Sequence, residues 1–359
     1  MDPISQAALG AVTGKAVGHA RLGWRAVGVG AVAGALPDID VLFSLNGDYF
    51  DQLVLHRGIT HSLFFAPVAG PLLGALVWAW ERARAVTPQG HGDAPGAGAT
   101  SAGRLRAWML VVTLALLSHP LLDLLTPYGT QLLLPFSDAR FAVNAMPIID
   151  PAYTLILLTG LAAGAWRWRQ QAGRVALVTL LLSCSYLAWG GYLNTGAERE
   201  ARRQLAAAGI HDATVRAFPT ILQLHYRRVV ARLPEEDRVG FLSTWRPCDI
   251  DWQPAPRTGE HPAVDAFLAS REGRIFDWFT MGWARYRIDL EQGSLVATDL
   301  RYGFDADPDR SIFSATAPLA DDDGGLAGPV RAGRGEVAVG DRLALLFRDT
   351  YASDCATAG

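Results

Sequence analysis

Long apolar runs are concentrated in the first half of the chain. Residues 63–80, 107–125, 151–166 and 175–193 form runs of about 16 to 20 residues each, and they contain almost no charged side chains. This length is close to what a helix needs to cross a hydrocarbon core of ~30 Å. We therefore predict four transmembrane helices.

Two weaker apolar pieces lie between residues 4 and 36, on either side of the polar segment 15–25. Both pieces are rich in Ala, Gly and Val, and such small side chains allow helices to approach closely. We predict a short helical hairpin packed against the other spans. Residues 87–103 contain Gly, Pro, Ala, Ser and Thr but almost no large apolar side chain, which predicts a flexible loop.

The pattern changes after residue 194, where charged residues are scattered through the chain. Residues 197–208 predict an amphipathic helix. Residues 222–233, 278–290 and 294–302 mix aromatic and aliphatic residues with polar ones in frequent alternation, which is typical of half-buried strands. The predicted fold is an α-helical polytopic membrane domain, residues 1–194, followed by a smaller, mainly β (α+β) soluble domain, residues 195–359.

Arginines mark one side of the predicted membrane domain. They flank the loop between the first two long spans and fill the next alternate loop, at Arg82, Arg84, Arg104, Arg106, Arg167, Arg169 and Arg174. Loops rich in Lys and Arg stay in the cytoplasm. We therefore expect residues 56–61, residues 126–150 and the C-terminal domain on the extracytoplasmic side of a bacterial inner membrane.

Overall charge and cysteine spacing argue against nucleic-acid binding and against a metal held by cysteines. The net charge is −3, from 32 basic and 35 acidic residues, so there is no basic surplus to favour nucleic acid. Cys184, Cys248 and Cys355 form no CxxC pair and no zinc-finger spacing, which argues against sulfur ligands for a metal. In an oxidising compartment Cys248 and Cys355 would form a disulfide, and two unpaired thiols are the alternative.

Polar residues that interrupt the apolar runs are carboxylates and imidazoles. Asp and His are costly to bury in a membrane and usually mark a functional site there. His119 and Asp123 are four residues apart, so a helix would place both on one face. Asp38 and Asp40 follow Pro37, and in an extended turn residues two apart point the same way. Both pairs could therefore address one cation.

A second cluster has the sequence His56-Arg57-Gly58-Ile59-Thr60-His61-Ser62, directly before the 63–80 span. The amides at a helix start and the Arg57 guanidinium both favour an anion such as phosphate. Any one of these histidines, taken alone, is more simply explained as a hydrogen-bonded residue between helices. Together, the clusters predict a divalent-metal site whose ligands are Asp38, Asp40, His56, His61, His119 and Asp123.

These clusters resemble the bacterial and archaeal family of membrane-bound metal-dependent hydrolases, also described as LexA-binding, inner-membrane-associated hydrolases. The resemblance runs from Met1-Asp2-Pro3 through Pro37-Asp38-Ile39-Asp40, the HRGITHS signature, and His119 to Asp123, and continues into Tyr128-Gly129-Thr130-Gln131 and Ile148-Ile149-Asp150-Pro151. It implies an integral inner-membrane hydrolase. The signature is also similar to that of zinc-dependent phospholipase C-like proteins, which favours phosphoesters.

One position departs from the family pattern. The family commonly begins Met-Asp-x-x-(Ser/Thr)-His, whereas this chain has Gln6 after Ser5. If that histidine is a metal ligand in relatives, Gln6 is a weaker substitute through its carbonyl oxygen. One of two metal ions would then be bound loosely or lost.

We therefore predict a metal-dependent hydrolase that acts on a phosphoester or lipid-linked ester. Imidazole and carboxylate ligands favour one or two ions of zinc, with manganese or magnesium as alternatives. Asp40 is also a candidate general base, Arg57 a catalytic group that holds the substrate anion, and Thr60 and Ser62 are further substrate contacts. The expected partners are the lipid bilayer and this substrate, without nucleic acid. The alternative hypothesis is a catalytically silent protein with a structural metal site that acts as an interaction partner.

Overall fold

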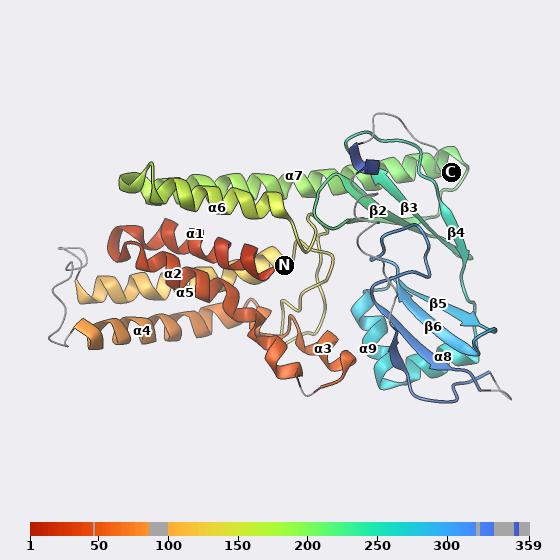
Figure 1. The fold of residues 1–359 in the computed structure, drawn as a ribbon. Helices are drawn as coiled ribbons and strands as arrows, with labels where there is room; N and C mark the ends of the chain where they lie inside the picture. Colours follow the sequence, from red (N-terminus) through yellow and green to blue (C-terminus); the bar gives the residue numbers. More distant parts are fainter. Residues whose placement is uncertain (46, 86–99, 321–323, 334–347, 352–359) are drawn as a thin grey trace. The chain divides into compact units, whose positions relative to one another are not determined.

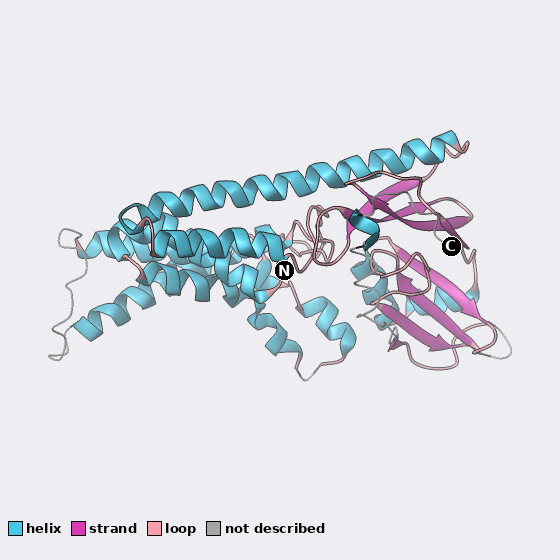
Figure 2. Ribbon diagram, turned by 45° about the horizontal axis from the view of Figure 1, so that its top comes forward, coloured by secondary structure: helices cyan, strands magenta, loops and turns pink. Residues whose placement is uncertain are grey.

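The computed structural model describes residues 1–45, 47–85, 100–320, 324–333 and 348–351. The chain divides into two compact units. Unit 1 comprises Met1–Asn46, Leu55–Val143 and Ile148–Trp189, and unit 2 comprises Gly47–Val54, Asn144–Pro147 and Gly190–Gly359. Helices make up unit 1 and the strands lie in unit 2 (Figure 2), so the predicted order of a helical part followed by a strand-rich part is confirmed. The boundary at residues 194 and 195 stays a prediction.

A tight helical hairpin opens unit 1 (Figure 1), made of α1 (Pro3–Leu22) and α2 (Arg25–Ala35). Asp2 caps α1 by accepting a hydrogen bond from the Ser5 amide at 2.9 Å, with Pro3 at the first helical position. The two helices approach so closely that a Cβ on Gly10 would lie 2.2 Å from the Gly30 carbonyl oxygen. The predicted close contact through small residues is therefore confirmed.

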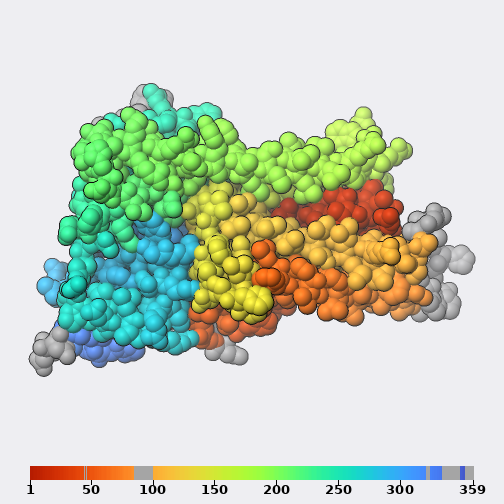
Figure 3. All heavy atoms as spheres, turned by 180° about the vertical axis from the view of Figure 1, so that it is seen from behind, coloured from red at the N-terminus to blue at the C-terminus, as the bar shows by residue number. Residues whose placement is uncertain are grey.

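The other helices of unit 1 are α4 (Phe65–Ala85), α5 (Ser101–Asp123), α6 (Pro151–Ala165) and α7 (Ala172–Ala207), which begins in unit 1. Helix α5 contacts α1, α2 and α4. In Figure 3, seen from behind, α4 and α5 (orange) lie side by side, with the segment that follows α5 (yellow) against their ends. Backbone hydrogen bonds fix the segment that follows α5. The Leu63 amide donates to the Leu132 carbonyl, and the Val143 amide donates to the Leu124 carbonyl.

The apolar helices only partly match the four predicted spans. Within the described residues, three helical segments are long and apolar enough to cross a membrane: Arg25–Phe43, Ser101–Asp123 and Arg169–Ala207. A fourth span results if Tyr49–His61 and Phe65–Arg84, which meet at a bend of 64°, count as one. The 151–166 prediction corresponds to α6, which has 15 residues and is too short by this measure. The candidate span Arg25–Phe43 includes part of the hairpin predicted for residues 4–36.

Helix α7 joins two elements that the sequence pattern had separated. The predicted span 175–193 and the predicted amphipathic helix 197–208 form one helix of 36 residues, Ala172–Ala207. The residues between them, Asn194, Thr195 and Gly196, are helical. A single glycine costs a helix only about 1 kcal/mol, which is too little to end a long helix.

Unit 2 contains two antiparallel sheets of four strands. The first has the order β1 (Thr214–Pro219), β2 (Tyr226–Arg232), β3 (Glu236–Ser243), β4 (Gln253–Pro256). The second has the order β5 (Ala284–Asp289), β6 (Ser294–Asp299), β7 (Ser314–Pro318), β8 (Arg331–Gly333). A buried cluster of Phe218, Val230, Val239 and Leu300 connects the two sheets.

Two helices that the sequence pattern did not predict, α8 (Pro262–Ala269) and α9 (Arg271–Thr280), pack on the second sheet. Phe267 of α8 lies 5.7 Å from Tyr286 of β5 between ring centres, and the Tyr286 hydroxyl donates to Asp277 of α9 at 2.8 Å. The predicted strand 278–290 is therefore shorter than expected, because its first residues end α9.

Some sequence-based predictions fall on residues outside the described part of the chain. Most of the 87–103 loop is among them, although α5 begins at Ser101. Cys355 is another, so its disulfide with Cys248 stays a prediction. Cys184 is a free, exposed cysteine.

Candidate metal centre

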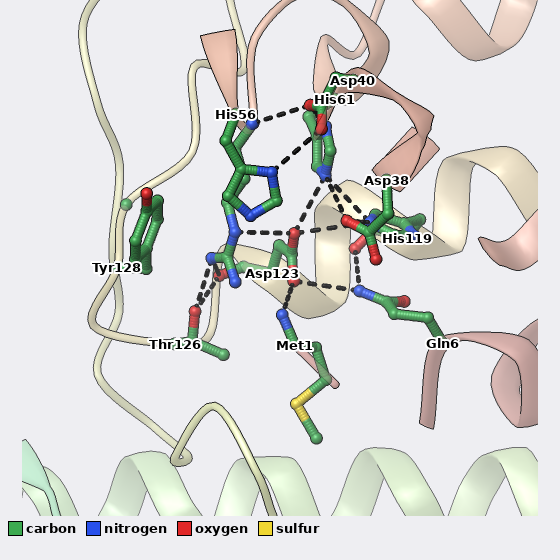
Figure 4. A network of polar contacts seen from close by, with 12 residues as sticks. Met1, Gln6, Asp38, Asp40, His56, His61, His119, Asp123, Thr126 and Tyr128 are labelled. Atoms are coloured by element: carbon green, nitrogen blue, oxygen red, sulfur yellow. Dashed lines mark hydrogen bonds and ion pairs between the residues drawn. The ribbon is translucent and has the colours of Figure 1, made fainter. Parts of the chain in front are cut away.

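Three short stretches of unit 1 bring the predicted ligands together (Figure 4). The 3₁₀ helix η1 (Leu36–Ser44) follows α2 directly and carries Asp38 and Asp40. The 3₁₀ turn η2 (Ile59–His61) carries His61, and His56 lies in the turn just before it. The last turn of α5 carries His119 and Asp123, and α5 continues through Pro120 without ending. The six predicted ligands therefore lie in one network of polar contacts.

His61, His119, Asp38 and Asp123 direct one ligand atom each at a common point. The Nε2 atoms of His61 and His119 are 3.0 Å apart. Asp123 Oδ2 lies 3.3 Å from the first and 3.5 Å from the second, and Asp38 Oδ1 lies 3.5 Å and 3.3 Å from them. All four ligand atoms lie within 4.8 Å of one another.

These distances fit a tetrahedral ion. Zinc binds nitrogen and oxygen at about 2.0–2.1 Å, and ligands at that radius in a tetrahedron are about 3.3 Å apart. The observed separations of 3.0–3.5 Å bracket that value. Asp123 Oδ2 is fully buried, and besides the two imidazoles it has Arg57 Nε at 3.1 Å. The group could therefore hold a metal ion.

Contacts behind the two histidines fix which ring nitrogen faces the common point. His119 Nδ1 lies 2.6 Å from the Gly34 carbonyl oxygen, which can only accept, so Nδ1 donates and Nε2 keeps its lone pair. His61 Nδ1 lies 3.1 Å from Asp40 Oδ2 and 3.1 Å from Thr60 Oγ1. A carboxylate behind a histidine is the usual way in which proteins orient a metal ligand.

Both carboxylate oxygens of Asp40 have contacts within the protein. Its Oδ1 lies 3.0 Å from His56 Nδ1, and its Oδ2 accepts from the Arg57 amide at 2.9 Å and from Thr60 Oγ1 at 3.1 Å. Asp38, Asp40 and His56 nevertheless form a second group that could hold an ion. Asp38 therefore belongs to both groups.

The extended turn that was expected at Asp38 and Asp40 is wrong, although the two carboxylates can still address one ion together with His56. In an extended turn the side-chain period is two residues. The chain instead forms a 3₁₀ helix with three residues per turn. Asp38 consequently faces the Nε2 atoms of His61 and His119, whereas Asp40 faces His56 and the opposite nitrogen of His61.

Arg57 is buried behind Asp123, with a positive φ of 61°. Its Nε lies 3.1 Å from Asp123 Oδ2, its Nη1 donates to Thr126 Oγ1 at 2.8 Å, and its guanidinium lies 4.7 Å from the centre of the Tyr128 ring. Sequence reasoning gave no role to Thr126 or to the Gly34 carbonyl, because neither a lone Thr nor a backbone oxygen stands out in a residue pattern.

The oxygen of Asp123 that faces away from the histidines is held at the N-terminus of α1. The Gln6 side-chain amide donates to Asp123 Oδ1 at 3.0 Å, and the Met1 amino group lies 2.5 Å from the same oxygen. In this arrangement Gln6 presents its nitrogen to the site, and its carbonyl oxygen is buried without a hydrogen-bond partner among the described residues. Gln6 thus orients a candidate ligand.

The hydroxyls of Thr60 and Ser62 are used within the protein. Thr60 donates to Asp40, and Ser62 Oγ donates to the Leu134 carbonyl at 2.5 Å. Their contact with a substrate stays a prediction. Asp150 lies outside the cluster: it caps α6 by accepting from the Tyr153 amide at 3.1 Å, and the Tyr186 hydroxyl donates to it.

Residues 1–197 match the family described as YdjM inner membrane protein. The chain belongs to this family. It is also 36% identical over 141 residues to "Inner membrane protein YbcI" of Escherichia coli (strain K12), a match that covers 38% of this chain and 69% of that protein. No solved structure matches. The protein is thus a YdjM-family inner membrane protein with up to four candidate spans, and the matched region contains all six predicted ligands.

Proposed function

We propose that this YdjM-family protein is a metal-dependent hydrolase of phosphoesters or lipid-linked esters. The observation that carries the proposal is the buried set of Asp38, His61, His119 and Asp123, whose four ligand atoms converge at separations suited to one tetrahedral ion. His61, His119 and Asp123 are fully buried, whereas the Asp38 side chain is 21% exposed. Asp38 is thus the one of these four side chains that solvent reaches.

The ligand chemistry favours zinc, with manganese or magnesium as alternatives, because the donors are imidazoles and carboxylates. A bound divalent cation would lower the pKa of a water molecule toward neutrality and polarise the scissile ester. Asp38 is shared by both candidate groups, so its carboxylate is placed to bridge two ions. A pair of ions suits a phosphoester, since it stabilises both the attacking and the leaving oxygen.

His56, backed by Asp40, is the residue proposed to move a proton. Asp40 alone is a poor general base, because its oxygens already contact His56, the Arg57 amide, Thr60 and His61. Its contact with His56 Nδ1 orients that ring, whose side chain is 27% exposed. A histidine held by a carboxylate accepts and returns protons efficiently. When the second group holds no ion, His56 takes this role, and Arg57 balances the charge of Asp123.

Exposed apolar side chains beside the ligands support a lipid-linked substrate. Ile39, Leu42 and Phe43 lie on the same 3₁₀ helix as Asp38 and are 43–62% exposed. Phe64, which follows His61 closely, is 45% exposed and contacts Phe136 with 5.1 Å between ring centres. An exposed apolar rim is suited to lipid chains. The site is proposed to face the extracytoplasmic side, opposite the arginine-rich loops.

Metal content tests the proposal. Detergent-purified full-length protein should retain one or two equivalents of zinc or manganese, and His56→Ala should retain one. His61→Ala should lose the ion that Asp38, His61, His119 and Asp123 hold. His211→Ala is the matched control, because His211 is exposed and lies in unit 2. Size-exclusion chromatography and thermal unfolding establish that each variant is folded.

Activity is then measured on metal-loaded protein with bis(4-nitrophenyl) phosphate and with a phospholipid in mixed micelles. Wild-type turnover that disappears in His61→Ala supports a hydrolase. Full metal occupancy in folded His61→Ala would remove His61 from the ligands and refute the site. A metal-loaded protein that cleaves neither phosphoesters nor carboxylic esters would leave a structural metal site, as in an interaction partner.

A further inference from the structure

The side chains of α7 mark where its candidate membrane span ends. The apolar run 175–193 of this helix lies between Arg174 and Asn194. Its length is close to what a helix needs to cross a hydrocarbon core of ~30 Å. Near the end of the run, Trp189 is 48% exposed and Tyr192 is 60% exposed. Because Trp and Tyr are enriched where a membrane meets water, the head-group layer should begin at this turn of α7.

One end of the first sheet of unit 2 lies beside this turn of α7. Arg227 of β2 donates to the Gly190 carbonyl at 3.0 Å and to Asn194 Oδ1 at 3.2 Å. At the opposite end of the sheet, Arg202 of α7 donates to the Val215 carbonyl of β1 at 3.0 Å. Figure 1 shows β2 and β3 beside the second half of α7. The end of the sheet at which β1 stops and β2 starts is therefore the end nearest to the span.

Three aromatic rings meet at the same end of the sheet. Ser243, the last residue of β3, is paired with Tyr226, the first residue of β2, so Trp245 follows β3 at this end. Trp245 is 66% exposed, and its ring centre lies 5.4 Å from that of His225 and 5.9 Å from that of Tyr351. Tyr351 is 48% exposed. We call His225, Trp245 and Tyr351 the aromatic patch.

The exposure of the aromatic patch suits a membrane surface better than water. Trp245 is the one exposed tryptophan among the described residues of unit 2, where the other tryptophans are partly buried. An indole ring has a large apolar body and one N–H donor, so it favours a boundary with an apolar side and a wet side. Arg246, which follows Trp245 and is also exposed, adds a cation suited to lipid phosphates.

We propose that the aromatic patch docks unit 2 on the head-group layer of the bilayer that α7 crosses. The Trp245 ring would face the acyl chains and its N–H would face the head groups, at the depth of Tyr192 on α7. Continuity with the span identifies the bilayer as the occupant, because the hydrogen bonds of Arg227 hold this end of the sheet to the last apolar turn of α7. This surface is separate from the metal centre and does not depend on the proposed hydrolase activity.

Quenching of tryptophan fluorescence tests the proposal. Full-length wild-type protein and Trp245→Phe are reconstituted into liposomes of phosphatidylethanolamine and phosphatidylglycerol. The difference between their emission spectra gives the signal of Trp245. Lipids brominated on the acyl chains quench a tryptophan that touches the bilayer, whereas acrylamide quenches a tryptophan in water. The Trp245 signal should be lost with brominated lipids and should largely persist with acrylamide.

Trp252→Phe is the matched control, because Trp252 also lies in unit 2 but packs against the core between α7 and the first sheet. The signal of Trp252, obtained in the same way, should persist with brominated lipids. Size-exclusion chromatography and thermal unfolding establish that each variant is folded. Trp245→Tyr serves as a second variant if Trp245→Phe does not fold.

Two outcomes would overturn the proposal. A Trp245 signal that acrylamide quenches and brominated lipids leave unchanged would place the aromatic patch in water. A signal that neither quencher changes would assign the patch to a protein contact, such as a second copy of this chain. Quenching by brominated lipids together with protection from acrylamide would support docking on the bilayer.

Discussion

Replacing Gly10 with alanine should weaken metal binding although Gly10 contacts none of the ligands directly. A Cβ at Gly10 would lie 2.2 Å from the Gly30 carbonyl oxygen and 2.7 Å from Gly34 Cα, whereas ordinary contact begins at 3.4 Å. Helices α1 and α2 must therefore separate by about 1.2 Å, the difference between 3.4 and 2.2 Å. Such overpacking costs about 1–3 kcal/mol of stability.

The displacement reaches the candidate metal centre through Gly34. The Gly34 carbonyl accepts a hydrogen bond from His119 Nδ1 at 2.6 Å, and η1 with Asp38 follows α2 directly. A shift of about 1 Å breaks this hydrogen bond and moves Asp38 beyond the roughly 0.2 Å tolerance of metal–ligand distances. Loss of such a contact behind a ligand typically lowers metal affinity about 10- to 100-fold.

Competition with a zinc chelator measures this affinity, and thermal unfolding measures stability in the same samples. Gly28→Ala is the matched control, because Gly28 is exposed on α2 and an added Cβ there meets no atom within 4 Å. The control should bind zinc as the wild type does and be as stable or slightly more stable. Zinc affinity of Gly10→Ala equal to that of the wild type would refute the idea that helix spacing positions the ligands.

Three further predictions concern unit 2. Arg301→Ala should destabilise it by about 3–5 kcal/mol in denaturant titration, because Arg301 and Asp299 form a fully buried ion pair at 2.6 Å; a loss below 1 kcal/mol would contradict this. Phe267→Ala should lower the free energy of unfolding by about 3–5 kcal/mol, since this side chain of α8 is completely buried. Burial and the nearby Arg227 lower the pKa of His225. As the pH falls, His225 therefore binds a proton more readily in the unfolded chain than in the folded one, so stability should fall below about pH 6.5. His225→Gln should flatten this pH dependence, whereas His211→Gln should not.

The sequence alone determined the features that depend on local spacing and residue type. Apolar runs gave the helices of unit 1, glycines and alanines gave the tight hairpin of α1 and α2, and alternation gave several strands of unit 2. The i, i+4 spacing placed His119 and Asp123 on one face of α5, where Nε2 and Oδ2 are 3.5 Å apart. The chemical type of the candidate ligands was therefore readable from the residues.

Tertiary structure decided which atom faces which partner. The 3₁₀ form of η1 turns Asp38 toward the shared point and Asp40 toward the back of His61, and no residue pattern distinguishes this from an extended turn. Gln6 contacts Asp123 across 117 residues of chain, and Lys15 is buried against Trp24 only once the helices have packed. Hydrophobic and propensity patterns report local energies, whereas these contacts depend on side chains that are distant in sequence, so only the folded chain specifies them.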